Sequence, residues 1–149
     1  MNMRFTKLGL ALVCAAGLAG TVAEAQQGNT ISVPVTGLAN NNGTVRCGLF
    51  NSAATFPKDG QEFQGVAAPI VNQQATCAFT NVPPGTYAVA VFQAAPGQTV
   101  MRKSWVGMPQ DPYGFSRNAP IGMGPPAFSA AAYSYQGGAV TFPVTIVNP

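Results

Sequence analysis

From residue 26 onward the chain consists of short runs in which apolar and polar residues alternate, and turn residues separate the runs. Alternation with a period of two is typical of a β-strand that buries one face. The pattern predicts six or seven strands, the clearest at 30–36, 44–50, 64–71, 74–80, 86–93 and 139–147. Because no amphipathic helix lies between them, we expect an all-β fold: an antiparallel β-sandwich of about seven strands, forming a single domain over residues 26–149. In the first strand, Pro34 predicts a position at a sheet edge, because proline cannot donate to a central ladder.

Residues 94–135 break this rhythm and are rich in glycine, proline and aromatic side chains. Their aromatic side chains carry too much apolar area to remain in water, so we expect one long ordered loop. Short helical turns are predicted at 127–131 within it and, earlier in the chain, at 51–57, capped by Asn51 or Ser52.

The N-terminus has the pattern of a secretory signal peptide. Arg4 and Lys7 precede an apolar run over 8–20, and the small residues Ala23 and Ala25 flank Glu24. We expect residues 1–25 to be removed and the protein to be periplasmic or secreted. The alternative is a retained membrane anchor, but the run is shorter than the roughly 20 residues that span a bilayer. No membrane span is therefore expected after cleavage.

Cys47 and Cys77 remain after cleavage, whereas Cys14 is lost with the signal peptide. Both lie on inward phases of separate predicted strands, and export would bring them to an oxidising compartment. We favour a disulfide between them, and two buried thiols are the alternative. A redox-active pair is disfavoured because the two cysteines lack the Cys-x-x-Cys spacing.

Charge is scarce, and this narrows the possible functions. The chain has no histidine, which excludes Ser-His-Asp catalysis and histidine-ligated metal sites. After cleavage five scattered cations remain, too few to bind nucleic acid. Asp59 and Glu62 could form a carboxylate pair, but a solvated loop is the better interpretation of a glycine-containing turn. We expect neither an enzyme nor a cofactor.

The segment 102–118 combines basic and aromatic residues, and two interpretations of it stay open. In one, aromatic faces and cations bind a sugar or a small anion. In the other, which we favour, Trp105, Tyr113 and Phe115 pin the loop to the sandwich and the cations form its solvated rim. The candidate binding residues are Arg102, Lys103, Trp105, Tyr113, Phe115 and Arg117.

Several motifs resemble a known family. The turn and strand at 82–89 (VPPGTYAV) are similar to those of transthyretin-like and carboxypeptidase-regulatory-like sandwiches. The ordered set VRCGLFN, FP, GMP, YGFSRN and GPPAF resembles the exported bacterial family called domain of unknown function 2141, over about 31–147. The resemblance implies a secreted or periplasmic sandwich with no established activity.

The sequence departs from that family after Phe92. Relatives continue with a loop whose oxygen ligands are suited to a hard cation such as calcium. Here the corresponding positions hold Gln93, Ala94, Pro96, Gln98 and Arg102. Because the acids are replaced and cations are added, we expect no metal site.

The sequence thus favours a monomeric, non-enzymatic binding or structural module of the cell envelope, with an unknown envelope partner or a glycan. The alternative function is recognition of a carbohydrate or small anion by the 102–118 loop. Strand addition to a partner at an open sheet edge is a third possibility.

Overall fold

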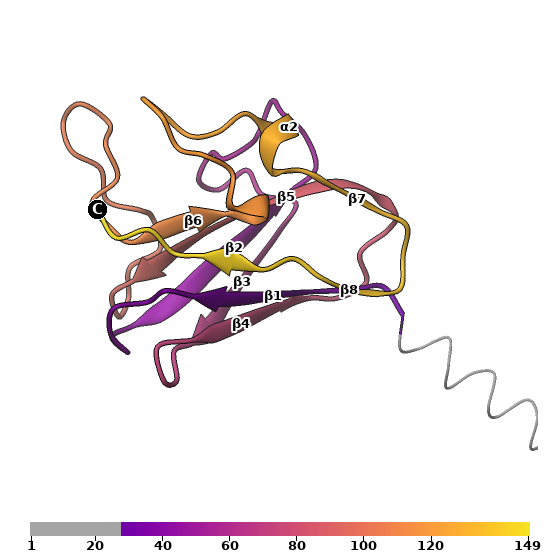
Figure 1. Cartoon of the computed structure of the whole chain (residues 1–149), viewed down its shortest axis with the longest axis horizontal. Coiled ribbons are helices and arrows are strands. Elements are labelled where there is room, and N and C mark those ends of the chain that lie inside the picture. The colour runs from indigo at the N-terminus through magenta and orange to yellow at the C-terminus, as the bar shows by residue number, and fades with distance from the viewer. Residues whose placement is uncertain (1–27) are drawn as a thin grey trace, which may run out of the picture.

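The computed structural model describes residues 28–149, so the predicted signal peptide and Cys14 lie outside the described residues. Two β-sheets pack face to face and form a sandwich (Figure 1). The first sheet contains β1 (Thr30–Thr36), β4 (Ala75–Phe79), β8 (Ala139–Thr141) and β9 (Val144–Thr145). The second sheet contains β2 (Thr44–Phe50), β3 (Gln64–Pro69), β5 (Gly85–Ala94), β6 (Tyr113–Phe115) and β7 (Tyr133–Tyr135). The predicted all-β sandwich is confirmed.

Strand order follows β4-β1-β8 in the first sheet and β3-β2-β5-β6 in the second, with β9 beside β1 and β7 beside β5. Most neighbours are antiparallel, as predicted, but β1 runs parallel to β8 and β9. The predicted strand 139–147 is therefore divided in two, and the first sheet is mixed.

The predicted edge position of Pro34 is wrong, because β1 lies between β4 on one side and β8 and β9 on the other. The backbone nitrogen of Phe142 donates to the carbonyl of Ser32 at 2.8 Å, so the backbone polar atoms of Ser32 point toward β8. Residues two apart in a strand point their backbone polar atoms to the same side, so those of Pro34 also face β8 and β9. Pro34 falls where β8 has ended and β9 has not begun. A central strand tolerates proline here because the missing donor coincides with a break in the ladder.

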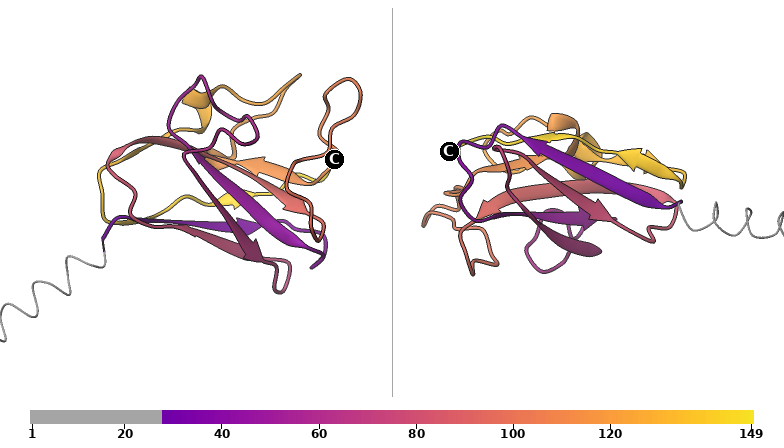
Figure 2. Two further views of the ribbon diagram at one scale, coloured as in Figure 1. Left: turned by 180° about the vertical axis from the view of Figure 1, so that it is seen from behind. Right: turned by 90° about the horizontal axis from the view of Figure 1, so that it is seen from below.

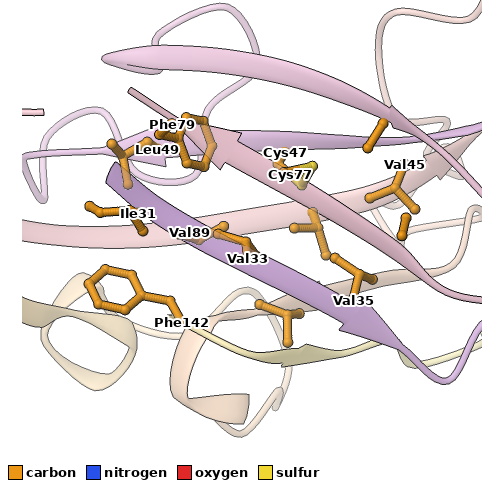
Figure 3. Close-up of a cluster of buried hydrophobic side chains, with 14 of the residues drawn as sticks. Ile31, Val33, Val35, Val45, Cys47, Leu49, Cys77, Phe79, Val89 and Phe142 are labelled. Atoms are coloured by element: carbon orange, nitrogen blue, oxygen red, sulfur yellow. A yellow bond between two sulfur atoms is a disulfide. The ribbon is translucent and has the colours of Figure 1, made fainter. Parts of the chain in front are cut away.

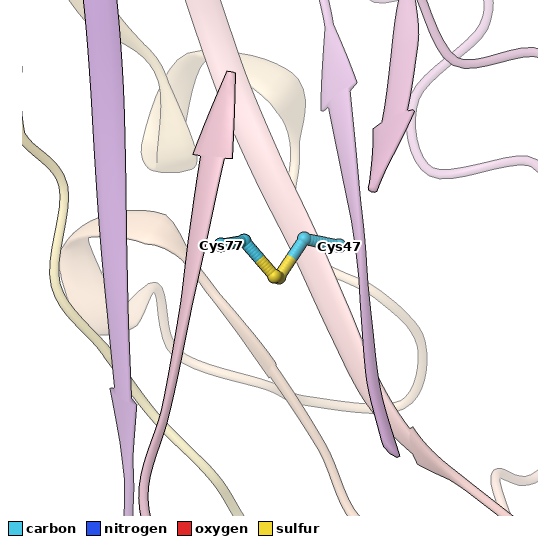
Figure 4. Close-up of a disulfide and its surroundings, with 2 residues drawn as sticks. All are labelled: Cys47 and Cys77. Carbon is cyan, nitrogen blue, oxygen red and sulfur yellow. A yellow bond between two sulfur atoms is a disulfide. The ribbon is translucent and has the colours of Figure 1, made fainter. Parts of the chain in front are cut away.

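The core between the sheets is built from the inward-facing residues of strands in both sheets, among them Ile31, Val33 and Val35 of β1 (Figure 3). Cys47 of β2 and Cys77 of β4 face each other in this core, and their sulfur atoms form a disulfide (Figure 4). Their Cα atoms are 6.5 Å apart. Since β2 and β4 belong to different sheets, the disulfide covalently joins the two layers.

The long segment after β5 folds back over the outer face of the second sheet. It contains β6, the short turn Ser116–Asn118, the helical turn α2 (Phe128–Ala131) and β7. The predicted helical turn is confirmed, whereas β6 and β7 were not predicted. The segment closes a second apolar cluster, made of Phe50, Phe56, Ala88, Phe92, Ala94, Tyr113, Phe115, Ala119 and Ala131. Strand β5 is consequently covered on both faces over most of its length.

Two loops of this segment, 99–110 and 119–126, project from the sandwich in both the front view and the view from behind (Figure 2). Within residues 28–149, no helix is long and apolar enough to cross a membrane.

Candidate functional site

A groove of about 500 Å³ lies over the outer face of the second sheet. Two rows of paired residues cross the strands and form much of its floor. The first row runs Gly65, Gly48, Ala90 and Phe115 across β3, β2, β5 and β6. The second row runs Ala67, Arg46, Phe92 and Tyr113. The first row places three residues with little or no side chain next to one another, and the Phe50 ring and the Glu62 side chain lie close over Gly48.

Three loops form the walls of the groove: 57–62, 99–109 and 121–125. The ammonium of Lys103 lies 4.0 Å from a carboxylate oxygen of Asp59, so a weak ion pair connects the first two walls. The side chain of Glu62 lies over the small floor residues. A Cβ atom added at Gly65 would come within 3.2 Å of its carboxylate oxygen, and one added at Gly48 within 3.4 Å of its Cβ.

Met101, Met108 and Met123, which are the methionines of the described residues, all line this groove. Methionine is flexible and polarisable, and it adapts to apolar partners of different shapes. Together with Phe92, Phe115 and the small floor residues, these side chains supply the apolar part of a mixed lining, to which Arg46, Asp59, Glu62 and Lys103 add charged groups.

Asp111 fixes the base of the 99–110 loop. Its side chain is almost fully buried, with the residue 1% exposed. One carboxylate oxygen accepts from the Nε atom of Arg102 at 2.9 Å, and the other accepts from the Arg102 backbone nitrogen at 2.8 Å and from Gln98 at 2.6 Å. Burial alone would raise the pKa of Asp111, but these hydrogen bonds and the charge of Arg102 outweigh it and lower the pKa. The carboxylate therefore stays ionised and holds both ends of the loop.

The tip of that loop is a tight hairpin turn. The backbone nitrogen of Ser104 donates to the carbonyl of Met108 at 2.8 Å, and the Met108 nitrogen donates to the Ser104 hydroxyl at 3.2 Å. Trp105 lies at the tip, is 96% exposed and does not line the groove. The turn thus holds the indole out in solvent.

The six candidate binding residues do not form one surface. Tyr113 and Phe115 lie on the groove floor, and Lys103 lies on a wall. Arg102 is engaged by Asp111. The guanidinium of Arg117 lies 5.8 Å from the ring centroid of Tyr133 and donates to a backbone carbonyl.

The pinning interpretation is correct for two aromatic side chains and wrong for the third. The rings of Tyr113 and Phe115 are buried, and the Phe115 centroid is 5.7 Å from that of Phe56. Trp105 pins nothing, because the hairpin turn is held by its own backbone and by the Arg102–Asp111 pair.

Ser116 is a structural residue that the sequence analysis missed. Its buried hydroxyl accepts from the backbone nitrogen of Val89 at 2.8 Å and donates to the carbonyl of Ala131 at 2.5 Å. Val89 lies on β5 between the part that pairs with β6 and the part that pairs with β7. The serine side chain therefore supplies the hydrogen bond that neither strand provides, and nothing in the local sequence pattern indicated this.

Two of the positions at which the resemblance implied lost cation ligands, Gln93 and Gln98, take part in internal hydrogen bonds. The amide nitrogen of Gln93 donates to the Asn40 side chain and to the Asn42 carbonyl, both at 2.8 Å. Gln98 donates to Asp111, as described above. Among residues 28–149, no group of three or more His, Cys, Asp or Glu side chains could hold a metal ion.

Comparison with known proteins identifies a family but no individual relative. No curated protein and no solved structure matches the chain. A family model described as "Uncharacterized protein conserved in bacteria (DUF2141)" matches residues 33–142, from within β1 to just beyond β8. The chain belongs to this family of uncharacterised bacterial proteins.

Proposed function

We propose that the protein is an exported, non-enzymatic binding module of the bacterial cell envelope, and that its ligand lies in the groove over the second sheet. Export rests on the signal-peptide pattern of residues 1–25 and agrees with a core disulfide, which persists in an oxidising compartment such as the periplasm. A transthyretin-like sandwich released into the periplasm or the medium fits this proposal.

The groove itself carries the proposal. Ligand pockets typically enclose roughly 300–1,000 Å³ and combine an apolar lining with a few polar groups. This groove has a volume of about 500 Å³, a floor that includes Gly48, Gly65 and Ala90, and three methionines around it. We infer an amphipathic small molecule with a flat or chain-like apolar body, whose polar end contacts Arg46 or the Lys103–Asp59 pair.

The charged residues of the groove support binding rather than catalysis. Lys103 and Asp59 face each other, and Arg46 lies between apolar neighbours on the floor. Asp111 carries the one buried carboxylate among the described residues, and it accepts hydrogen bonds from Arg102 and Gln98. Among residues 28–149, no serine or threonine hydroxyl is hydrogen-bonded to an acidic or basic side chain.

The test compares the binding of a fluorescent amphipathic probe, 1-anilinonaphthalene-8-sulfonate, to the unmodified protein and to two matched variants. Ala67→Leu extends an exposed floor position on β3, and Ala78→Leu makes the same change at an exposed position on β4 in the other sheet. We expect Ala67→Leu to weaken probe binding by roughly tenfold and Ala78→Leu to leave it unchanged. Equal affinity of the two variants, or no probe binding to the unmodified protein, would show that the groove is not the site.

Recognition of a carbohydrate or small anion remains the second candidate, because the Trp105 indole is exposed and Lys103 lies nearby in the chain. Tyr113 and Phe115 are buried and do not contribute to it, whereas Arg102, although paired with Asp111, keeps 66% of its side chain exposed. Titration with neutral and sulfated oligosaccharides, followed by the fluorescence of Trp105, tests it: an unchanged emission spectrum removes this candidate.

A further inference from the structure

The groove opens between two projecting loops whose exposed side chains are mostly apolar. Loop 99–110 presents Trp105, Val106 and Met108, and loop 119–126 presents Met123, which is fully exposed. Val106, Met108 and Met123 line the same groove, so the two loops meet at one rim, and they project together in Figures 1 and 2. We call these four residues, with Arg102 and Lys103, the rim surface.

Both charged side chains of the rim surface are cationic and exposed, although each has a carboxylate partner: Asp111 for Arg102 and Asp59 for Lys103. Loop 99–110 contains Arg102 and Lys103 and no acidic residue, and loop 119–126 contains no charged residue. Asp111, beside the first loop, is buried and paired with Arg102, whose side chain is still 66% exposed. The ion pair between Lys103 and Asp59 spans 4.0 Å and is exposed, so it holds Lys103 weakly.

The exposure of Trp105 is built into the loop. The Arg102–Asp111 pair fixes the base of the loop, and the Ser104–Met108 hydrogen bonds form the tip. Exposing an indole ring to water is unfavourable. Tryptophan is enriched at places where part of its side chain meets an apolar phase and part meets water, as at a membrane interface. The loop therefore holds its largest apolar side chain, Trp105, in water at the hairpin tip.

We propose that the rim surface docks on an anionic lipid bilayer. Trp105 and Met123 would enter the interfacial layer, while Arg102 and Lys103 contact lipid phosphates. A second copy of the chain fits less well, because four side chains on two narrow loops offer on the order of 500 Å², below the roughly 800 Å² that each partner of a stable interface buries. Two exposed cationic side chains next to a protruding indole favour a surface that is both anionic and penetrable.

The experiment uses Trp105 as its own reporter, because it is the one tryptophan in the chain. Protein recovered from cells that express the whole chain is mixed with vesicles of phosphatidylglycerol and phosphatidylcholine, with and without bromine on the acyl chains. We expect a blue shift of the emission with phosphatidylglycerol, quenching by the brominated lipid, and much weaker effects with phosphatidylcholine alone.

Three variants followed by vesicle co-sedimentation make the test specific. Trp105→Ser is expected to lower the partition coefficient by roughly tenfold, and Lys103→Gln by about fivefold. Val71→Ser removes a side chain that is 64% exposed on the distant β3–β4 turn, and is expected to change nothing. Any contribution of residues 1–27 is common to all three variants, so it cannot produce the difference between them.

Each other outcome overturns the proposal. No blue shift with anionic vesicles, or equal partition of the Trp105→Ser and Val71→Ser variants, shows that the rim surface does not enter the bilayer. A blue shift that grows with protein concentration in the absence of vesicles assigns the surface to a second copy. A shift with oligosaccharides and none with vesicles assigns it to a glycan.

Discussion

Arg102 and Asp111 clamp the two ends of the loop that forms one wall of the groove. The Nε atom of Arg102 donates to one oxygen of the Asp111 carboxylate at 2.9 Å, and its backbone nitrogen donates to the other oxygen at 2.8 Å. One residue thereby satisfies both oxygens of a buried carboxylate. The wall and the exposed hairpin tip share this single anchor.

Asp111→Asn is expected to destabilise the protein by roughly 1–3 kcal/mol. Both oxygens of Asp111 accept hydrogen bonds, so the amide group of asparagine would face a donor from Arg102 or Gln98 in either orientation. Urea unfolding measures the loss. Asp59→Asn is the control, because its ion pair with Lys103 is long and exposed, and it is expected to unfold like the unmodified protein.

The same carboxylate predicts acid sensitivity. The pKa of Asp111 is lower in the folded state than in the unfolded state, so the unfolded chain takes up the proton first as the pH falls. The stabilisation is complete above the unfolded pKa of about 3.9 and is lost as the pH drops below it toward the folded pKa. Unfolding curves measured between neutral pH and about pH 2 should show a shallower acid loss for Asp111→Asn. Parallel losses in both proteins would contradict this assignment.

Much of the fold could be predicted because β1 and β2 alternate between fully buried residues and partly buried ones. Their predicted bounds, 30–36 and 44–50, match the structure. Strand β6 could not be recognised, because Tyr113, Gly114 and Phe115 are all buried and show no alternation. The parallel pairing of β1 with β8 and β9 could not be predicted either, because alternation with a period of two identifies a strand but not which strand lies beside it.

The groove was less predictable than the fold. Gly48, Gly65 and Ala90 come from three strands, and only the register of the second sheet aligns them in one row. The candidate binding residues were predicted within 102–118 instead, because aromatic and basic residues are adjacent in the chain there. That segment supplies part of a wall and of the floor, but its most prominent residue, Trp105, lies outside the groove.

Loss of the disulfide is expected to lower the free energy of unfolding by about 3–4 kcal/mol in the chain-entropy model, because Cys47 and Cys77 are 30 residues apart in sequence. Urea unfolding of the oxidised and the reduced protein measures the difference. Mass analysis after alkylation without reductant should find neither of these two cysteines labelled. Labelling of both in protein recovered from the periplasm would contradict the bond.

Ser116→Ala is expected to cost roughly 1–3 kcal/mol, because it leaves the buried backbone nitrogen of Val89 without its acceptor. Amide hydrogen exchange at Val89 should accelerate more than at Val91, which β6 continues to cover. Ser134→Ala, at an exposed serine, is the control. Unchanged protection at Val89 would show that the serine does not complete this edge of β5.

Trp105 and Phe115 provide the sharpest contrast between an exposed and a buried aromatic side chain in the same segment. Phe115 is 7% exposed and packs against Phe56, whereas Trp105 is 96% exposed. Phe115→Ala should therefore lower the free energy of unfolding by about 3 kcal/mol or more. Trp105→Ala should change it by less than about 0.5 kcal/mol, because no packing is lost. A large loss in the Trp105 variant would mean that the indole packs on the sandwich, and it would remove the docking surface together with the exposed hairpin tip.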